Sequence, residues 1–194
     1  MKMTLLIAAL AAAPTYRGAW FSGCITYRLE AHNAAGETLE TSFGAENQLY
    51  ISGQGYKMLA AHRRLLEVYD SQTDQRQAFG ADGQLVARAD TVRPTIRPVA
   101  ATQQVLGYPC QAVQVRVPGV VSTVFFAPAL RVNPASFRTP ASGPTGALLQ
   151  ATGGALPLRV VTMGTAAGFT LVSEATSVQP LVLKAADFAT AAGR

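Results

Sequence analysis

Short runs of alternating apolar and polar residues, separated by turn residues, are the feature that most constrains this fold. In the clearest run, residues 21–30, one parity holds Phe21, Gly23, Ile25, Tyr27 and Leu29. A period of two predicts a half-buried β-strand. The alternation returns over 113–117, and Pro118-Gly119 then turns the chain into a second strand over 120–126.

The rest of the chain shows the same rhythm. Strands are expected at 38–43, 48–52, 65–70 and 75–79, and the dipeptide Asp82-Gly83 predicts a two-residue hairpin turn. Residues 90–104, which contain two prolines, are expected to be an irregular connection or an edge strand. Residues 147–177 are expected to form a closing meander. About ten short strands with tight turns indicate a mainly antiparallel β protein.

Three segments depart from this rhythm. Residues 57–64 contain no β-branched residue and are expected to be a short helix, and a terminal helix is expected within 182–192. Residues 128–146, rich in proline and glycine, are expected to form a long, mobile loop. The apolar face of the sheet must be covered by closure into a barrel, by a sandwich, or by curling around a helix or ligand.

The N-terminus has the pattern of a signal peptide over residues 1–13. A short basic start precedes the apolar run Thr4–Ala13, with cleavage expected after Ala11 because Pro14 hinders cleavage after Ala13. The alternative is a buried N-terminal strand or helix. We therefore expect an exported protein, periplasmic or extracellular, with a single β-rich domain over residues 20–194. No apolar run approaches the ~18 residues of a spanning helix.

The charge pattern limits the classes of partner. The chain has 16 Lys and Arg against 11 Asp and Glu, and the basic residues are scattered. Nucleic-acid binders gather such charge on one stripe, so no nucleic-acid partner is expected. A mild attraction to anionic lipid headgroups, and so a peripheral contact with a membrane, stays open.

Several motifs, in order along the chain, resemble those of secreted bacterial proteins of the GLPGLI family and of the related domain-of-unknown-function family 4412. The first strand matches at Gly23, Ile25 and Tyr27, and the mid-chain turn matches at Leu106, Gly107, Tyr108 and Cys110. An aromatic pair, Phe125-Phe126, leads into Pro128. A later segment keeps both glycines, Gly143 and Gly146, but moves the proline, which favours the broader relative.

This resemblance implies a fold like the periplasmic lipoprotein carriers: a curved, antiparallel open half-barrel with one or two short helices and an apolar hollow. A closed β-barrel or a β-sandwich is the alternative. Phe125, Phe126 and Leu148 would line the hollow. The resemblance implies no reaction.

Cys24 and Cys110 are the only cysteines, and strand parity places both on the more polar faces of their strands. Exported proteins with two cysteines commonly pair them, so a disulfide is expected as one alternative and two separate thiols as the other. Phe21-Ser22-Gly23-Cys24 also resembles a lipoprotein signal box. Pro14 and Arg17 separate this box from the apolar run Thr4–Ala13, which such boxes normally adjoin, so lipid anchoring is the less favoured interpretation.

No catalytic constellation is visible. His32 and His62 are the only histidines, neither has metal-ligand spacing, and no nucleophile elbow is present. We expect no cofactor, no metal and no enzymatic activity, with a hydrolase as an unlikely reading. The leading hypothesis is an envelope protein that binds a lipid, an acyl chain or a lipoprotein in a concave sheet. The alternative is a structural or protein-interaction module with a filled core.

Overall fold

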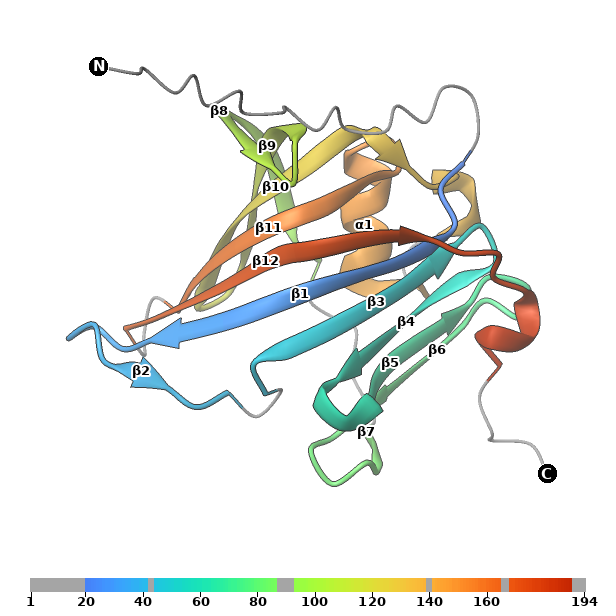
Figure 1. Ribbon diagram of the computed structural model, residues 1–194, viewed down its shortest axis with the longest axis horizontal. Helices are drawn as coiled ribbons and strands as arrows, with labels where there is room; N and C mark the ends of the chain where they lie inside the picture. The colour runs from blue at the N-terminus through green and yellow to red at the C-terminus, as the bar shows by residue number, and fades with distance from the viewer. Residues whose placement is uncertain (1–19, 42–43, 87–92, 139–140, 165–167, 190–194) are drawn as a thin grey trace, which may run out of the picture.

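One antiparallel sheet dominates the protein. The computed structural model describes residues 20–41, 44–86, 93–138, 141–164 and 168–189. The sheet follows the order β7-β6-β5-β4-β3-β1-β12-β11-β10-β9-β8, and β2 pairs with the end of β1 (Figure 1). The first six strands are β1 (Gly23–His32), β2 (Thr38–Leu39), β3 (Glu46–Ser52), β4 (Gly55–Ala60), β5 (Leu65–Asp70) and β6 (Gln75–Phe79). The others are β7 (Leu85–Val86), β8 (Thr95–Val105), β9 (Tyr108–Val117), β10 (Val120–Arg131), β11 (Ala155–Gly164) and β12 (Phe169–Pro180).

The sheet is an open half-barrel, which confirms the predicted fold class. Strands β7 and β8 stand at opposite ends of the strand order, so the sheet does not close on itself. Its curvature coincides with register shifts in four strand pairs, among them β1–β12 at Thr26/Tyr27 and β10–β11 at Phe125/Phe126. Such bulges increase the local twist and bend a sheet. The curved sheet wraps around helix α1 (Gly143–Ala151) (Figure 1).

The main core lies between the sheet and the segment that carries α1. It includes Ile25 and Tyr27 of β1, Leu156 and Leu158 of β11, and Leu149 of α1. A smaller cluster joins Val113, Val124 and Phe126 with Ala155. Half-buried Leu148 packs against this second cluster, so one helix contributes adjacent residues to both.

The prediction of a helix at residues 57–64 is wrong. Residues 55–60 form β4, and only Ala61–Arg63 make a single 3-10 turn, η1. Strand β4 pairs with β3 on one side and with β5 on the other. Two hydrogen-bonded neighbours outweigh the helix propensity of the Met-Leu-Ala sequence, because propensity is a weak prior beside tertiary context.

The prediction of a long loop at 128–146 is also wrong, because most of this segment belongs to regular elements or packs into the core. Strand β10 continues to Arg131, the 3-10 turn η2 covers Pro134–Ser136, and α1 begins at Gly143. Val132, Phe137 and Ser142 have no exposed surface, so this segment is packed into the core. Residues 147–151, the first part of the expected closing meander, instead belong to α1, because this segment packs Leu149 against the concave face of the sheet.

Two further expectations concern the ends of the chain. In the described part of the predicted terminal helix, residues 182–189, only the 3-10 turn η3 (Ala185–Asp187) forms, and residues 190–192 lie outside the described residues. The predicted signal peptide at 1–13 lies outside the described residues.

Residues 95–105 of the predicted connection or edge form the edge strand β8. Within the described part of the chain, no helix has the length and apolar character to cross a membrane.

Candidate functional site

A cavity of about 320 Å³ lies on the concave face of the half-barrel and is the candidate site. Seven strands contribute to its lining, from both sides of β1 in the sheet order. Apolar and polar side chains both take part. The lining residues are Leu29, Asn47, Met58, Leu66, Glu67, Phe79, Val160, Thr162, Leu171 and Ser173.

Strand register brings these residues together from distant parts of the chain. Leu29 faces Ser173 across β1 and β12, Thr162 faces Leu171 across β11 and β12, and Met58 faces Glu67 across β4 and β5. Residues directly opposite in an antiparallel pair share one face of the sheet. The cavity is therefore a consequence of register. We call it the sheet cavity.

Tyr27 marks the boundary between the sheet cavity and the filled part of the hollow. Its hydroxyl donates to the carbonyl oxygen of Pro157 at 2.8 Å, which links β1 to β11 past the intervening β12. Beyond it, Tyr56, Tyr69 and Phe137 form an aromatic group with ring centroids 5.7 to 6.3 Å apart. Together with α1, these rings fill the hollow near the start of β1.

A buried polar group connects the sheet cavity to this filled part. The Tyr56 hydroxyl donates to Glu67, and it lies 3.2 Å from the carbonyl oxygen of Ser142, just before α1. Arg76 approaches the same carboxylate at 3.8 Å, and both charged side chains are largely buried. Burial and the adjacent Glu67 charge raise the pKa of Tyr56 well above its usual value, so its hydroxyl stays protonated as a donor.

Asn47 supplies a second acceptor to the lining. Its Oδ1 is buried and has no hydrogen-bond partner among the described residues. A buried acceptor without a partner is costly, and in native structures such a group usually has a reason. Most of the lining is apolar, and Asn47 Oδ1 and the Glu67 carboxylate place hydrogen-bond acceptors at two points of it.

The three residues expected to line the hollow lie elsewhere. Phe126 and half-buried Leu148 belong to the second apolar cluster, and Phe125 packs against the main core. None of the three is in the lining of the sheet cavity. The residues that do line it were missed because their strands were predicted without pairing partners. The parity that Leu29 shares with Ile25 was the available signal for the cavity face.

The motif residues have structural roles in the described chain. A Cβ on Gly23 would lie 2.2 Å from the carbonyl oxygen of Gln179, so glycine permits the close approach of β1 and β12. Leu106 and Gly107 are the two residues of the β8–β9 turn, with φ of 51° and 80°, as a type I′ hairpin requires. Tyr108, Cys110, Ile25 and Tyr27 are buried in the main core.

The two later motif glycines surround the start of α1. Gly143 has φ +62°, and a Cβ there would lie 1.5 Å from Nη1 of Arg76. A Cβ on Gly146 would lie 1.7 Å from the Oγ of Ser142. Both glycines therefore allow the helix to sit directly on buried polar side chains.

Both cysteines are free thiols in the structure, and both are buried. Strands β1 and β9 are separated by β12, β11 and β10. Cys110 belongs to the main core, whereas Cys24 lies outside it, next to Tyr50 on β3. The structure thus corresponds to the alternative of two separate thiols. The expected polar face is wrong for Cys110, which packs in the main core, whereas Cys24 is buried beside Tyr50 and Thr26. Burial raises the pKa of both thiols.

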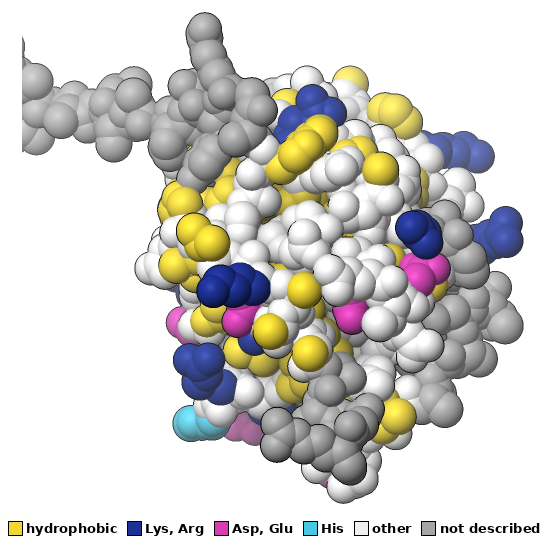
Figure 2. Space-filling model, turned by 90° about the vertical axis from the view of Figure 1, so that its right-hand side faces the viewer, with side chains coloured by type: hydrophobic (Ala, Val, Ile, Leu, Met, Phe, Trp, Pro, Cys, Tyr) yellow, Lys and Arg dark blue, Asp and Glu magenta, His cyan; other side chains and the backbone are white. Residues whose placement is uncertain are grey.

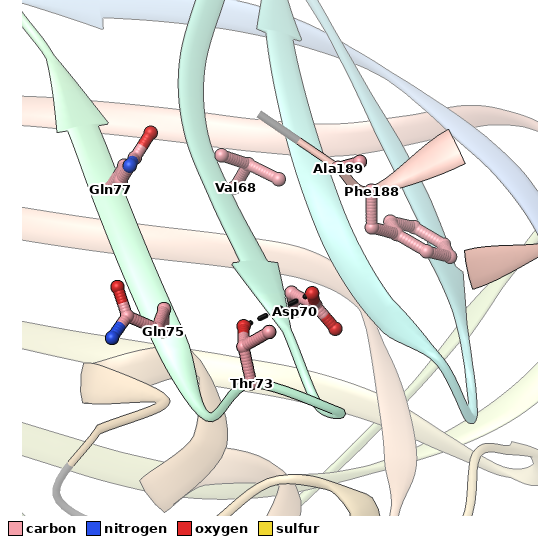
Figure 3. A pocket seen from close by; sticks show the side chains of 7 residues that line it. All are labelled: Val68, Asp70, Thr73, Gln75, Gln77, Phe188 and Ala189. Atoms are coloured by element: carbon pink, nitrogen blue, oxygen red, sulfur yellow. Dashed lines mark hydrogen bonds between the residues drawn. The ribbon is translucent and has the colours of Figure 1, made fainter. Parts of the chain in front are cut away.

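Two other hollows are less suited to a ligand. One of about 330 Å³ lies on the outer face of β5 and β6, where Phe188 packs after η3 (Figure 3). Its Asp70 already accepts hydrogen bonds from Gln72 and Thr73 within its own turn. The other, about 670 Å³, is an open depression along β8 and β9. Among the residues that the structure describes, no three His, Cys, Asp or Glu side chains gather as metal ligands would.

Comparison by sequence finds no matching family model and no matching curated protein. The resemblance to the GLPGLI-related proteins therefore stays an expectation.

Several solved structures have a similar course of the chain. PNGF-II matches at 13% identity over 84% of this chain and 29% of its own, with a TM-score of 0.49. This chain thus spans less than a third of the length of PNGF-II. A LolA-superfamily protein from Nitrosomonas europaea matches at 10% identity over 92% of both chains, with a TM-score of 0.40. MucB in complex with MucA(peri) matches at 15% identity over 89% of this chain and 55% of its own, with a TM-score of 0.34.

Proposed function

We propose that this chain is an exported, non-enzymatic envelope protein that holds the apolar part of a lipid, an acyl chain or a lipoprotein in the sheet cavity. The observation that supports this most is the cavity itself. It has a volume of about 320 Å³ and lies on the part of the concave face that α1 does not cover. This volume lies at the lower end of the range for small-molecule sites, about 300–1,000 Å³. Leu29, Val160 and Leu171 give it an apolar wall.

The polar groups of the lining define the ligand further. Asn47 Oδ1 and the Glu67 carboxylate are acceptors, so they favour a ligand with a hydrogen-bond donor near its apolar part. An amide, an ammonium group or a hydroxyl next to an acyl chain has this chemistry. The apolar wall would supply affinity, and the two acceptors would supply orientation.

The test is native mass spectrometry of the chain expressed with export, followed by solvent extraction of bound molecules. A co-purifying lipid of defined mass is expected. Val160→Trp places a large ring in the cavity and should abolish the bound mass. Val161→Trp is the matched control, because successive side chains on a strand point to opposite faces.

Two results would contradict the proposal. One is an apo mass for the unmodified chain after exposure to lipid extract. The other is equal lipid content in the two tryptophan variants, which would place the lipid outside the sheet cavity.

A second candidate function is a protein-interaction module of the envelope, favoured by the edge strand β8. This strand has 11 residues, and among the described strands it has one neighbour, β9. An extended peptide can add to such an edge through main-chain hydrogen bonds. A photo-crosslinking residue at Ala100 in β8 should then capture one partner in intact cells. The same residue at Leu85, in the opposite edge strand, should not capture that partner.

A further inference from the structure

A cluster of exposed apolar side chains lies at the end of the half-barrel where β1 begins and β12 ends. Trp20 is 54% exposed, Leu181 is 40% exposed and Val182 is 91% exposed. Single exposed apolar residues are common on soluble proteins and need no explanation. Here three of them lie on two adjacent segments, and one is the only tryptophan of the chain.

Backbone hydrogen bonds hold these segments side by side. The N–H of Leu181 donates to the carbonyl oxygen of Ser22 at 2.9 Å, and the N–H of Leu183 donates to the Ser22 hydroxyl at 3.3 Å. On the other side, the N–H of Phe21 donates to the carbonyl oxygen of Arg131 at 2.6 Å. The ends of β10, β1 and β12 thus form one surface. We call it the end patch, comprising Trp20, Leu181, Val182, Arg131 and Lys184.

The end patch carries positive charge beside its apolar residues. Arg131 and Lys184 are both exposed, and they stand on the segments that flank Trp20 and Val182. The one carboxylate on residues 181–189, that of Asp187, accepts the backbone N–H of Lys184. Figure 2 faces this end of the molecule and shows hydrophobic side chains interspersed with Lys and Arg and with some Asp and Glu.

We propose that the end patch docks on the surface of an anionic phospholipid membrane. Tryptophan is enriched at membrane–water interfaces, where its ring sits among the headgroups. Leu181 and Val182 would enter the outer part of the acyl region, and Arg131 and Lys184 would face the anionic headgroups. The full sequence has 16 basic and 11 acidic residues, and the excess that remains without Lys2 of the predicted signal peptide adds to this attraction. The docking does not depend on a ligand in the sheet cavity.

The single tryptophan makes the docking directly measurable. The full chain, expressed with export, is mixed with vesicles of phosphatidylcholine or of an equimolar mixture with phosphatidylglycerol. With the anionic vesicles, the emission of Trp20 should shift to the blue and the protein should sediment with the lipid. Added salt should weaken the binding, because it screens headgroup charge.

Three variants locate the contact. Val182→Ser should lower vesicle partitioning about tenfold, because a fully exposed apolar side chain no longer enters the lipid. Lys184→Gln should lower it about fivefold on anionic vesicles. Met163→Ser is the matched control, since Met163 is 46% exposed at the far end of β11 and lies outside the end patch. All variants share one N-terminus, so binding through residues 1–19 would be common to them.

Three outcomes would overturn the proposal. They are no binding to anionic vesicles, equal binding by the unmodified chain and Val182→Ser, or equal losses in Val182→Ser and Met163→Ser. If the chain instead forms a concentration-dependent dimer that Val182→Ser dissociates, the end patch is a protein contact and the membrane assignment fails.

Discussion

The hydroxyl of Tyr27 on β1 donates to the carbonyl oxygen of Pro157 on β11 at 2.8 Å, although β12 separates these strands in the sheet. A bond past an intervening strand forms only where the sheet is strongly curved. It also separates the sheet cavity from the part of the hollow that α1 fills. Tyr27 is therefore a sensitive position for testing the curvature.

Tyr27→Phe should lower the free energy of unfolding by about 1–2 kcal/mol, because it leaves the Pro157 carbonyl without this donor. Urea unfolding measures the change. Tyr50→Phe is the control, because the Tyr50 hydroxyl contacts only side chains, Gln48 at 3.3 Å and Cys24, so its loss leaves no backbone carbonyl without a donor. We expect the control to change stability by less than about 0.5 kcal/mol. Equal effects of the two substitutions would mean that the Tyr27 bond does not contribute.

Gly143→Ala should destabilise the protein by about 2 kcal/mol or more. Alanine at this position would have to adopt the left-handed backbone conformation that Gly143 has now. Its methyl group would also collide with the buried guanidinium of Arg76, which pairs with Glu67. Gly36→Ala has a similar positive φ of 81° with nothing within 4 Å, so it isolates the backbone cost. Thermal unfolding of the two variants compares them directly. A Gly143 variant no less stable than the Gly36 variant would contradict this account of α1 docking.

Stability should fall at alkaline pH because buried tyrosines resist ionisation. Burial, followed by the hydrogen bond to Asp74, raises the pKa of Tyr69 to about 12, and burial also raises the pKa of Tyr27. The folded protein then keeps protons that the unfolded chain releases from about pH 10. The free energy of unfolding should be unaffected by these groups below that pH. Above it, each group should lower the free energy by up to about 1.4 kcal/mol per pH unit.

Urea unfolding at increasing pH tests this window, and near-ultraviolet absorbance follows the phenolates. Tyr69→Phe should reduce the slope between about pH 10 and pH 12. A slope unchanged by Tyr69→Phe would show that Tyr69 ionises alike in both states.

The two thiols should react slowly and independently in the folded protein. Burial raises the pKa of Cys24 and of Cys110, so little reactive thiolate forms near neutral pH. Thiol-reactive reagent should label both cysteines only on unfolding, and reductant should leave the unfolding free energy unchanged. A mass lower by two hydrogens in the exported protein, restored by reductant, would show that the thiols pair after all.

Asn47→Leu should affect protein stability and ligand selectivity differently: the ligand-free protein should not become less stable, but the cavity should select its ligand less well. It removes a buried acceptor that has no partner among the described residues, so the ligand-free protein should be as stable as the original or up to about 1 kcal/mol more stable. Under our proposal, the variant should lose preference for lipids with a hydrogen-bond donor. Calorimetry of ligand-free protein and lipid extraction provide the two readouts. Gln48→Leu, on the opposite face of β3, is the control.

Local pattern predicted the elements that pair with near neighbours in sequence. The alternation at Ile25, Tyr27 and Leu29 identified β1 and its buried face, and the Leu106-Gly107 turn and the hairpin of β5 and β6 lie where expected. Residues 57–64 were predicted as a helix but largely form a strand, whereas residues 147–151 were predicted as part of a β meander but lie in α1. Their states depend on β3, β5 and the concave face of the sheet, which the local sequence does not contain.

By itself, the sequence determined that this chain forms a mainly antiparallel sheet with an apolar face to cover, because the period of two and the turn residues act over a few positions. Only the tertiary structure decided how that face is covered. Bulges curve the sheet, α1 and Phe137 fill one half, and the other half remains as a cavity between Leu29, Glu67 and Val160. These outcomes depend on register between strands far apart in the chain, and a local pattern does not encode which strands become neighbours.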